Sequence, residues 1–298
     1  MELKQLRYFV AVAEELHFGR AARRLGVSQP PLSRGIGVLE RELGLKLFNR
    51  TSHRVELTSA GRAFLPECLE IAAAVERAKA TVRSVGTQPS GLLRIGFVQA
   101  IGWPLQSSVL RKVVERYPAI VPALEPMSTA EQIRAIRDRQ LDIGVIWHAG
   151  DKVNSIFEEV VLAEAPSALV VAAGHPLARR RRVAIEHLAK ETLIMSPRRE
   201  NPEIHDGLMS ALRRSGVTPH VMYRRGPGII DMVAAGIGVS FTASMSPLTA
   251  RPDIVMRPFN QPVLMVHLAL VWLRGNEVAS LRGFLEVVTD LRERGQLL

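Results

Sequence analysis

The fold of the N-terminal part of the chain is decided by residues 18–40, which read FGRAARRLGVSQPPLSRGIGVLE. The first half of this stretch predicts a short helix that ends at Gly26, because glycine adopts the left-handed conformation at little cost. Ser28 is a favoured N-cap, and the two prolines after it suit the first turn of a second helix, where a missing N–H costs little. The stretch therefore predicts two helices joined by a tight turn.

Apolar spacing around this turn predicts which faces are buried. Apolar residues recur at three- and four-residue steps over 4–16, as in an amphipathic helix. The helix after the turn buries the stripe that begins at Leu32 and Ile36 and leaves its polar side chains free to face a nucleic-acid groove. Gln and Arg can make bidentate contacts to base edges, and Ser contacts a base or a phosphate. The candidate DNA-contacting residues here are Gln29, Pro30, Pro31, Ser33 and Arg34.

The next segment, 48–61, reads FNRTSHRVELTSAG and places basic residues between two β-prone ends. This pattern predicts a small β-wing in which Arg50, His53 and Arg54 enter a minor groove or pair with phosphates. The alternative is that 18–40 forms an ordinary helical hairpin with a solvated basic face. The neighbouring wing favours a DNA-binding head.

Composition sets wide limits on the whole chain. Its 298 residues allow a small DNA-binding domain and one or two domains with their own cores. The net charge is +10, and residues 1–58 hold ten Lys and Arg against six Asp and Glu, so positive charge is denser in the head, as phosphate binding requires. The single cysteine, Cys68, excludes an intramolecular disulfide. Without a signal peptide or a membrane span, we expect a cytoplasmic protein with no membrane partner.

Apolar residues at alternating steps of three and four form one line along a predicted helix over 61–85. Such a line is typical of a coiled-coil seam, and it ends at the linker-like GTQPSG of 86–91. We predict dimerisation here, which would join two DNA-binding heads. The alternative is a helix that packs on its own domain. The seam residues are Phe64, Cys68, Ile71, Val75, Ala78 and Val82, and we interpret Cys68 as a small buried hydrophobe rather than a redox switch.

After the linker, strand-like apolar runs alternate with amphipathic helices. LLRIGFV (92–98), IVPALEP (120–126) and DIGVIW (142–147) are separated by predicted helices, and the pattern continues to a strand at 265–273 and a last helix near 277–294. This order predicts an α/β domain with a parallel sheet covered by helices.

The N-terminal motifs together resemble the winged helix–turn–helix of LysR-type transcriptional regulators. SQPPLSR is followed at matching positions by LE, ELG, LF, R and LT-AG, and softer motifs (RIGF, the TAEQ–LDIG pair, GHPLA and VAAGIGVS) extend the resemblance towards the C-terminus. Two features depart from the family. His53 stands where the family usually has Arg, a role that Arg54 can take. Gly35 and Gly37 in the recognition helix each cost roughly 1 kcal/mol relative to Ala, and they mark either a helix that stiffens on DNA or neutral substitutions.

The resemblance implies three parts. Residues 1–58 would form the winged helix–turn–helix, 59–90 a dimerisation helix with a hinge, and 91–298 an effector-binding domain. This last domain would contain two Rossmann-like subdomains similar to periplasmic binding proteins, the first from 91–161 with 266–298 and the second from 162–265. The resemblance further implies a homotetramer, built as a dimer of dimers, that binds promoter DNA and contacts RNA polymerase. Closure of the cleft on an effector would change the placement of the dimers.

An effector would bind at the carboxyl ends of strands, beside helix N-termini. Five loops fit this rule, and their candidate residues are Gln99, Ala100, Ile101, Trp103, Ser128, Thr129, Trp147, Ser196, Arg198, Gly226 and Gly228.

The chemistry of the effector is left open by these loops. Relatives that sense benzoate- or muconate-like acids use a hydroxyl residue and an arginine, whereas the matching positions here are Ala100 and Trp147. One possibility is an organic acid held by Thr129, Arg198 and the N–H groups after Gly226. The other is an aromatic or more apolar molecule that stacks on a tryptophan, unless the tryptophans simply belong to the core.

Other functional classes find little support. The sequence contains no HExxH or CxxC metal spacing, no GxxxxGK[ST] phosphate loop and no GxSxG elbow, so we expect no metal site, no cofactor and no enzyme. A solute-binding protein for a transporter is consistent with the pattern of 91–298, but such a protein would have no function for a DNA-binding head. The four arginines of 179–182 are interpreted as a solvated run rather than a nucleic-acid patch.

Overall fold

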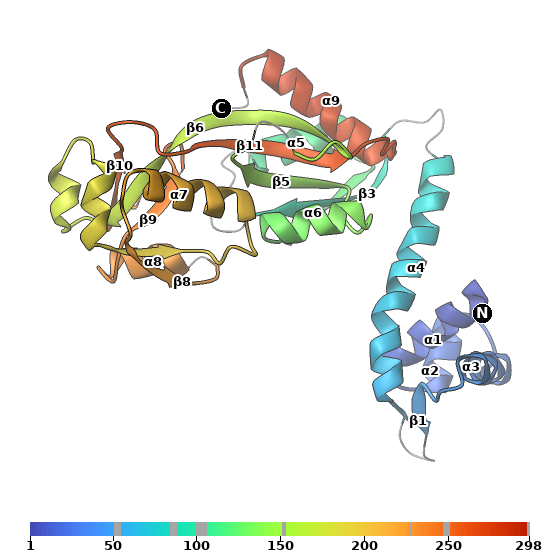
Figure 1. The fold of residues 1–298 in the computed structure, drawn as a ribbon. Coiled ribbons are helices and arrows are strands. Elements are labelled where there is room, and N and C mark those ends of the chain that lie inside the picture. The colour runs from blue at the N-terminus through green and yellow to red at the C-terminus, as the bar shows by residue number, and fades with distance from the viewer. Residues whose placement is uncertain are drawn as a thin grey trace. The chain divides into compact units, whose positions relative to one another are not determined.

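The computed structural model of the chain describes residues 1–50, 55–83, 89–98, 106–150, 153–226, 228–246 and 251–296. Contacts between residues divide it into two compact units, Met1–Val85 and Gly86–Leu298 (Figure 1). The narrower boundaries predicted at 58, 90, 161 and 265 stay predictions.

The N-terminal unit begins with the three predicted helices, α1 (Leu3–Glu15), α2 (Phe18–Arg24) and α3 (Gln29–Leu43). The imidazole Nδ1 of His17 caps α2 by accepting the N–H groups of Gly19 and Arg20 at 3.0 and 3.2 Å. Gly26 follows with a φ of +66°, the left-handed turn that the sequence predicts. Ser28 is the N-cap residue of α3, although its side chain makes no capping hydrogen bond.

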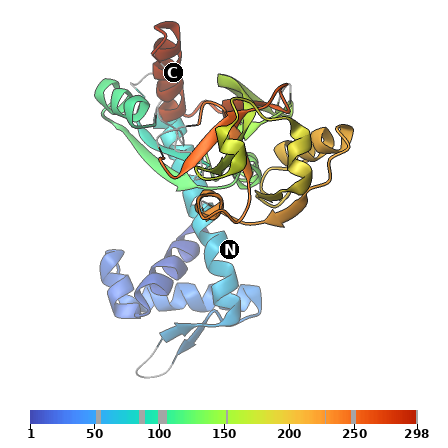
Figure 2. The same ribbon diagram turned by 90° about the vertical axis from the view of Figure 1, so that its left-hand side faces the viewer.

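The predicted wing is also present. Strands β1 (Phe48–Arg50) and β2 (Val55–Leu57) form an antiparallel pair that extends from the helices (Figure 2). The Phe9 ring lies 5.3 Å from that of Phe48, between centroids, and ties α1 to the wing. The buried carboxylate of Glu40 accepts the N–H groups of Leu47 and Phe48 at 3.0 and 3.3 Å, which fixes the start of β1 against α3.

Helix α4 (Ser59–Arg83) contains the predicted seam, but the structure assigns its first half a different partner. Cys68 is completely buried in the core of the N-terminal unit, and Phe64 and Ile71 pack against the same core. These three residues therefore pack on the head of their own chain, as in the alternative for this helix, and the dimer seam stays a prediction. Burial raises the pKa of the Cys68 thiol to about 12, which suits a packing residue rather than a redox switch.

The two unusual glycines of α3 differ in their surroundings. A Cβ at Gly35 would lie 2.8 Å from Cδ2 of Tyr8, so this glycine lets α1 approach α3 closely. A Cβ at Gly37 would meet nothing within 4 Å. Only Gly35 is therefore required by packing within the unit.

We expect Gly37→Ala to slow amide hydrogen exchange along α3 about fivefold in the full chain without DNA, because the helix gains roughly 1 kcal/mol. Gly35→Ala is the matched control: the same change in the same helix forces the Tyr8 ring to move and should give no such protection. Equal protection in both variants, measured by mass spectrometry, would contradict this account.

The C-terminal unit is built on a seven-stranded sheet in the order β10-β6-β11-β5-β3-β4, with β9 also paired to β6. Strands β3 (Gly91–Phe97), β4 (Ile120–Pro126) and β5 (Ile143–His148) are parallel, as predicted. Strand β11 (Met265–Leu273) runs antiparallel to β5 and to β6 (Phe157–Ala172). The sheet is thus mixed, with the predicted parallel strands beside antiparallel ones.

Strand β6 serves both halves of this unit (Figure 1). Its first part pairs with β11 as far as Pro166, and its last part pairs with β9 (Ser240–Ala243) and β10 (Ile254–Pro258). In the sequence, the apolar run SALVVAA (167–173) predicts only the second part, because charged residues and a proline interrupt the apolar pattern of the first. Strand β10 was not predicted at all.

Helices cover both faces of the sheet. On the half next to β3, α5 (Gln106–Arg116) and α9 (Ala279–Glu293) pack on one face and α6 (Thr129–Arg137) on the other. On the far half, one hydrophobic cluster joins α7 (Pro202–Arg214), the 3₁₀ helices η1 (Pro176–Arg179) and η2 (Ile185–Lys190), and two strands. These strands, β7 (Thr192–Met195) and β8 (His220–Tyr223), form a parallel pair. The short helix α8 (Gly228–Ala234) packs on the opposite face.

Two glycines set the position of α6. A Cβ at Gly96 would lie 2.8 Å from Cγ of Gln132, and one at Gly144 would lie 2.7 Å from its Oε1. These glycines are paired on β3 and β5, and Gln132 is completely buried between them and donates to the Met127 carbonyl at 3.1 Å. The RIGF, TAEQ and LDIG motifs thus form one packing contact, which holds the N-terminus of α6 at the edge of the sheet.

Candidate functional site

The first candidate site is the outer face of α3. Gln29, Pro30 and Arg34 are exposed there, and Pro31 and Ser33 are half-buried. The opposite face, with Leu32, Ile36 and Leu39, is completely buried. The structure therefore places the predicted base-contacting residues on one accessible surface. Arg50 lies on β1 opposite Val55, but its side chain and all of His53 and Arg54 lie outside the described part.

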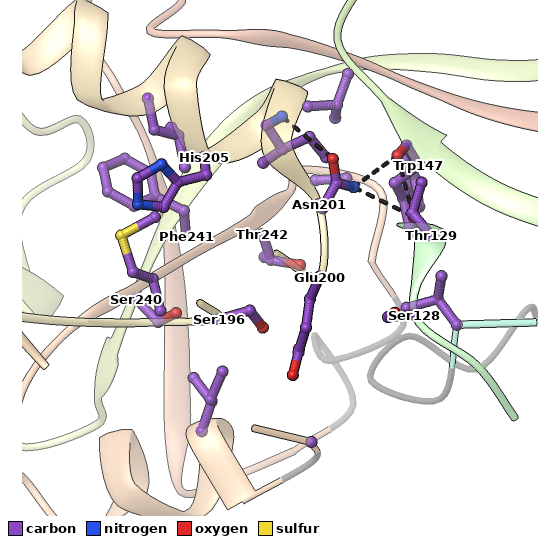
Figure 3. A pocket seen from close by; sticks show the side chains of 18 of the residues that line it. Ser128, Thr129, Trp147, Ser196, Glu200, Asn201, His205, Ser240, Phe241 and Thr242 are labelled. Carbon is purple, nitrogen blue, oxygen red and sulfur yellow. Dashed lines mark hydrogen bonds between the residues drawn. The ribbon is translucent and has the colours of Figure 1, made fainter. Parts of the chain in front are cut away.

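The second candidate site is a cavity of about 450 Å³ in the C-terminal unit (Figure 3). Its walls come from both halves of the sheet, since they include the start of α6 and Trp147 on one side and residues of β9 and α7 on the other. Cavities of this size hold small organic molecules.

Five predicted effector residues line this cavity: Ser128, Thr129, Trp147, Ser196 and Gly226. Arg198 and Gly228 do not line it, and their part in effector binding stays a prediction. Arg198 instead pairs with Asp206 on α7, with Nη2 2.7 Å from Oδ2. The remaining four, Gln99, Ala100, Ile101 and Trp103, lie outside the described residues. Trp147 is also 95% buried in the main core. Its position is therefore compatible with both roles that the sequence offered, contact with a ligand and packing in the core.

Several polar lining residues were not among the predicted effector residues, namely Glu131, Ser167, Glu200, Asn201, Arg225 and Thr242, although Glu200 and Asn201 lie in 196–202, one of the five predicted loops. Two of these residues could have been found from a local pattern in the sequence. Glu131 completes the capping-box pattern that begins at Ser128, and Asn201 precedes a proline as an N-cap would. Ser167 and Thr242 lie inside strands, where no local pattern marks a hydroxyl as facing a cavity.

The start of α6 is capped by its own residues. Glu131 Oε2 accepts the Ser128 N–H at 2.9 Å and the Ser128 hydroxyl at 2.7 Å, and Ser128 Oγ accepts the Glu131 N–H at 3.3 Å. These hydrogen bonds from Ser128 hold the pKa of Glu131 below its usual value. A carboxylate of the protein therefore already lies at this helix N-terminus.

Asn201 connects the two sides of the cavity (Figure 3). Its Oδ1 caps α7 by accepting the Ile204 N–H at 3.2 Å, and its Nδ2 donates to the Trp147 carbonyl at 2.8 Å and to Thr129 Oγ1 at 3.2 Å. A neighbouring backbone bond runs from the Ala130 N–H to the Glu200 carbonyl at 2.9 Å. The Asn201 side chain thus both caps α7 and bridges the two halves of the C-terminal unit.

Several ionisable side chains around the cavity already have partners within the protein. Arg225 Nε donates to Glu200 Oε1 at 2.7 Å. His205 has Asp206 Oδ1 3.0 Å from its Nδ1 and the Tyr223 hydroxyl 3.1 Å from its Nε2. No group of three or more His, Cys, Asp or Glu side chains that could hold a metal ion is found in the part of the chain that the structure describes.

These features define a class of protein: a winged helix–turn–helix in the same chain as an α/β unit with a ligand-sized cavity. The family model for the LysR substrate binding domain matches residues 86–292, and that for the bacterial regulatory helix-turn-helix protein, lysR family, matches residues 3–62. The chain belongs to the LysR family of transcriptional regulators, and it is a regulator rather than an enzyme.

Named relatives agree with this assignment. The chain is 34% identical over 280 residues to the HTH-type transcriptional regulator YnfL of Escherichia coli, which covers 93% of this chain and 94% of that protein. It is 35% identical over 279 residues to the probable cat1 operon transcriptional activator of Acinetobacter lwoffii, covering 90% of each.

Solved structures show the same fold. Full-length CbnR in complex with its target DNA gives a TM-score of 0.71 at 24% identity, over 97% of this chain and 99% of that one. Full-length BenM gives 0.58 at 25% identity, over 99% and 98%. None of the helices in the described ranges combines the length and apolar character needed to cross a membrane.

The two roles of Asn201 can be separated by substitution. Asn201→Asp keeps an acceptor for the Ile204 N–H but loses the donor to Trp147, whereas Asn201→Ala loses both. We expect hydrogen exchange at the Ala130 amide to become faster in both variants, and exchange at the Ile204 amide to become faster in Asn201→Ala alone. An Ala130 amide that exchanges at the wild-type rate in both variants would show that Asn201 does not hold the halves together.

Proposed function

We propose that this regulator binds promoter DNA through α3 and the wing, and that a small molecule in the cavity of the C-terminal unit controls its effect on transcription. The observation that carries the proposal is the pairing, in one chain, of an accessible recognition surface with a cavity whose walls come from two halves of a sheet. Several residues would contact DNA: Gln29, Pro30, Pro31, Ser33, Arg34, Arg50, His53 and Arg54.

The control would act through the halves of the C-terminal unit. A ligand shifts an equilibrium only by its different affinity for two arrangements. Here both halves contribute walls to the cavity and the Asn201 bridge joins them, which supports a ligand-dependent change in their placement. The change would reach the promoter through the oligomer.

We further propose a homotetramer, built as a dimer of dimers, that contacts RNA polymerase. Dimerisation would use the second half of α4, where Val75 is half-buried and Ala78 is exposed, and Val82, whose side chain lies outside the described set, continues the line. Joining two heads raises their affinity for paired half-sites through effective concentration.

The DNA-binding part is tested with Arg34→Ala, measured by gel mobility shift on DNA from upstream of the gene. We expect a loss of roughly 1–3 kcal/mol in specific binding and a weaker base preference, because an Arg on the recognition helix reads base edges. Arg213→Ala, which removes the same charge from the exposed surface of α7, is the control and should bind as the wild type does. Unchanged binding by Arg34→Ala would remove that residue from the DNA surface.

The effector part is tested with Thr129→Val, which keeps the side-chain volume and removes the hydroxyl that faces Asn201 and Trp147. For a ligand found by thermal-shift screening of the full chain with small aromatics and organic acids, we expect about tenfold weaker binding, in line with one lost hydrogen bond in a buried site. DNA binding should be unchanged. Thr289→Val, on the exposed face of α9, is the control. Equal ligand affinity in both variants would exclude Thr129 from the ligand site.

A further inference from the structure

The charge of the cavity wall bears on which ligands it accepts. Among the described lining residues, the acidic and basic side chains besides His205 are Glu131, Glu200 and Arg225, so two carboxylates accompany one guanidinium. Both ring nitrogens of His205 already have partners, Asp206 Oδ1 and the Tyr223 hydroxyl. Residues 99–105 and 227, which follow the lining residues Val98 and Gly226 in the sequence and are not described by the structure, contain no ionisable side chain.

The single guanidinium already has a partner. Arg225 Nε lies 2.7 Å from Glu200 Oε1, and the Glu200 side chain is only 15% exposed. A ligand carboxylate that approached Arg225 would have to displace Glu200 or share the guanidinium with it. Displacement would leave Glu200 as a largely buried, unpaired charge, which is costly.

The N-terminus of α6, a second group at the cavity wall that could attract an anion, is also occupied. Helix N-termini attract anions because their first N–H groups are unpaired. In α6 the Ala130 N–H donates to the Glu200 carbonyl and the Glu131 N–H to Ser128 Oγ. The Glu131 carboxylate lies at this end of the helix and would repel a second carboxylate in the same cavity.

Neutral hydrogen-bonding groups, in contrast, are available in the wall. Ser167 on β6 and Thr242 on β9 are 96% and 91% buried, and neither hydroxyl has a hydrogen-bond partner among the described residues. Their strands are adjacent, and since Ser167 lies opposite Ala243 and Ala168 opposite Thr242, the two side chains lie on alternate faces and act as separate groups. A hydroxyl can both donate and accept, so each suits a carbonyl, hydroxyl or amide group of a ligand. Most of the remaining wall is apolar, with residues such as Ile204, Phe241 and Leu264.

We propose that this cavity selects small molecules with an apolar body and uncharged hydrogen-bonding groups, and that it discriminates against the corresponding carboxylates. The inference rests on the proposed role of the cavity as the effector site. It replaces the organic acid that the sequence left open, since Arg198, the arginine expected to hold it, pairs with Asp206 and does not line the cavity.

The test uses matched pairs of a primary amide and its carboxylate: benzamide with benzoate, phenylacetamide with phenylacetate, and cinnamamide with cinnamate. Binding to the full chain is measured by ligand-observed NMR and thermal shift. We expect the amide to bind at least tenfold more tightly than its carboxylate in the pairs that bind.

Glu200→Gln provides the decisive variant. Glutamine keeps an acceptor for Arg225 but leaves this guanidinium, which is 60% exposed at the cavity wall, without its balancing charge, so carboxylate affinity should rise several-fold. Asp290→Asn is the matched control, because it unbalances Arg294 in the same way at a 63% exposed arginine at the end of α9, outside the cavity wall. It should leave both members of each pair unchanged.

A second variant tests the hydroxyls. Thr242→Val keeps the side-chain shape and should weaken amide binding several-fold, whereas Ser244→Ala, at an exposed residue next to β9 that does not line the cavity, should not.

The outcomes separate this inference from the proposed function. Tighter binding of carboxylates by the wild type, or an equal response of Glu200→Gln and Asp290→Asn, would overturn the ligand class and leave the effector site standing. If no member of any pair binds the wild type, the cavity is not an effector site for such molecules, and both proposals fall.

Discussion

The C-terminal unit depends on one long strand. β6 pairs with β11 through Pro166 and then with β9 and β10, so the two halves share a backbone rather than a loop. Proline has no N–H to give to a ladder, and the change of partner falls just after it, where the Ser167 N–H donates to the Leu264 carbonyl at 2.7 Å. Because the cavity lies between halves that share this strand, its shape and the geometry of the crossing cannot change independently.

The polar residues around the cavity serve the fold before they serve a ligand. Glu131 caps α6, Asn201 caps α7, and Glu200 balances Arg225. Each of these contacts also lies on the cavity wall or across it. A ligand that competes with these contacts perturbs the end of a helix directly. Binding therefore changes the structure of the unit without any intermediate residue. Fixed caps and ion pairs also limit the kinds of ligand that fit, because they are satisfied before any ligand arrives.

The sequence predicted the parts whose signals are local. The turn at Gly26, the prolines at the start of α3 and the alternating ends of the wing all depend on neighbours a few residues away, and the structure has them as predicted. Signals that depend on distant contacts were missed or left open. The apolar line of α4 is the same whether it packs on α1 or on a second copy, and only the tertiary fold places Cys68 inside the head. The pairing of Arg198 with Asp206 and the position of Thr242 on the cavity wall likewise arise from elements far apart in the chain.

The buried carboxylate of Glu40 has a consequence for how such a protein can change its target. By binding the backbone at Leu47 and Phe48, it fixes the separation of the recognition helix and the wing from within the head. The head therefore keeps a fixed spacing between α3 and the wing. In the proposed DNA complex, a new promoter cannot be reached by changing that spacing. Evolution must instead exchange side chains on an unchanged frame, and Gly37, where an added Cβ meets nothing, is one open position on it.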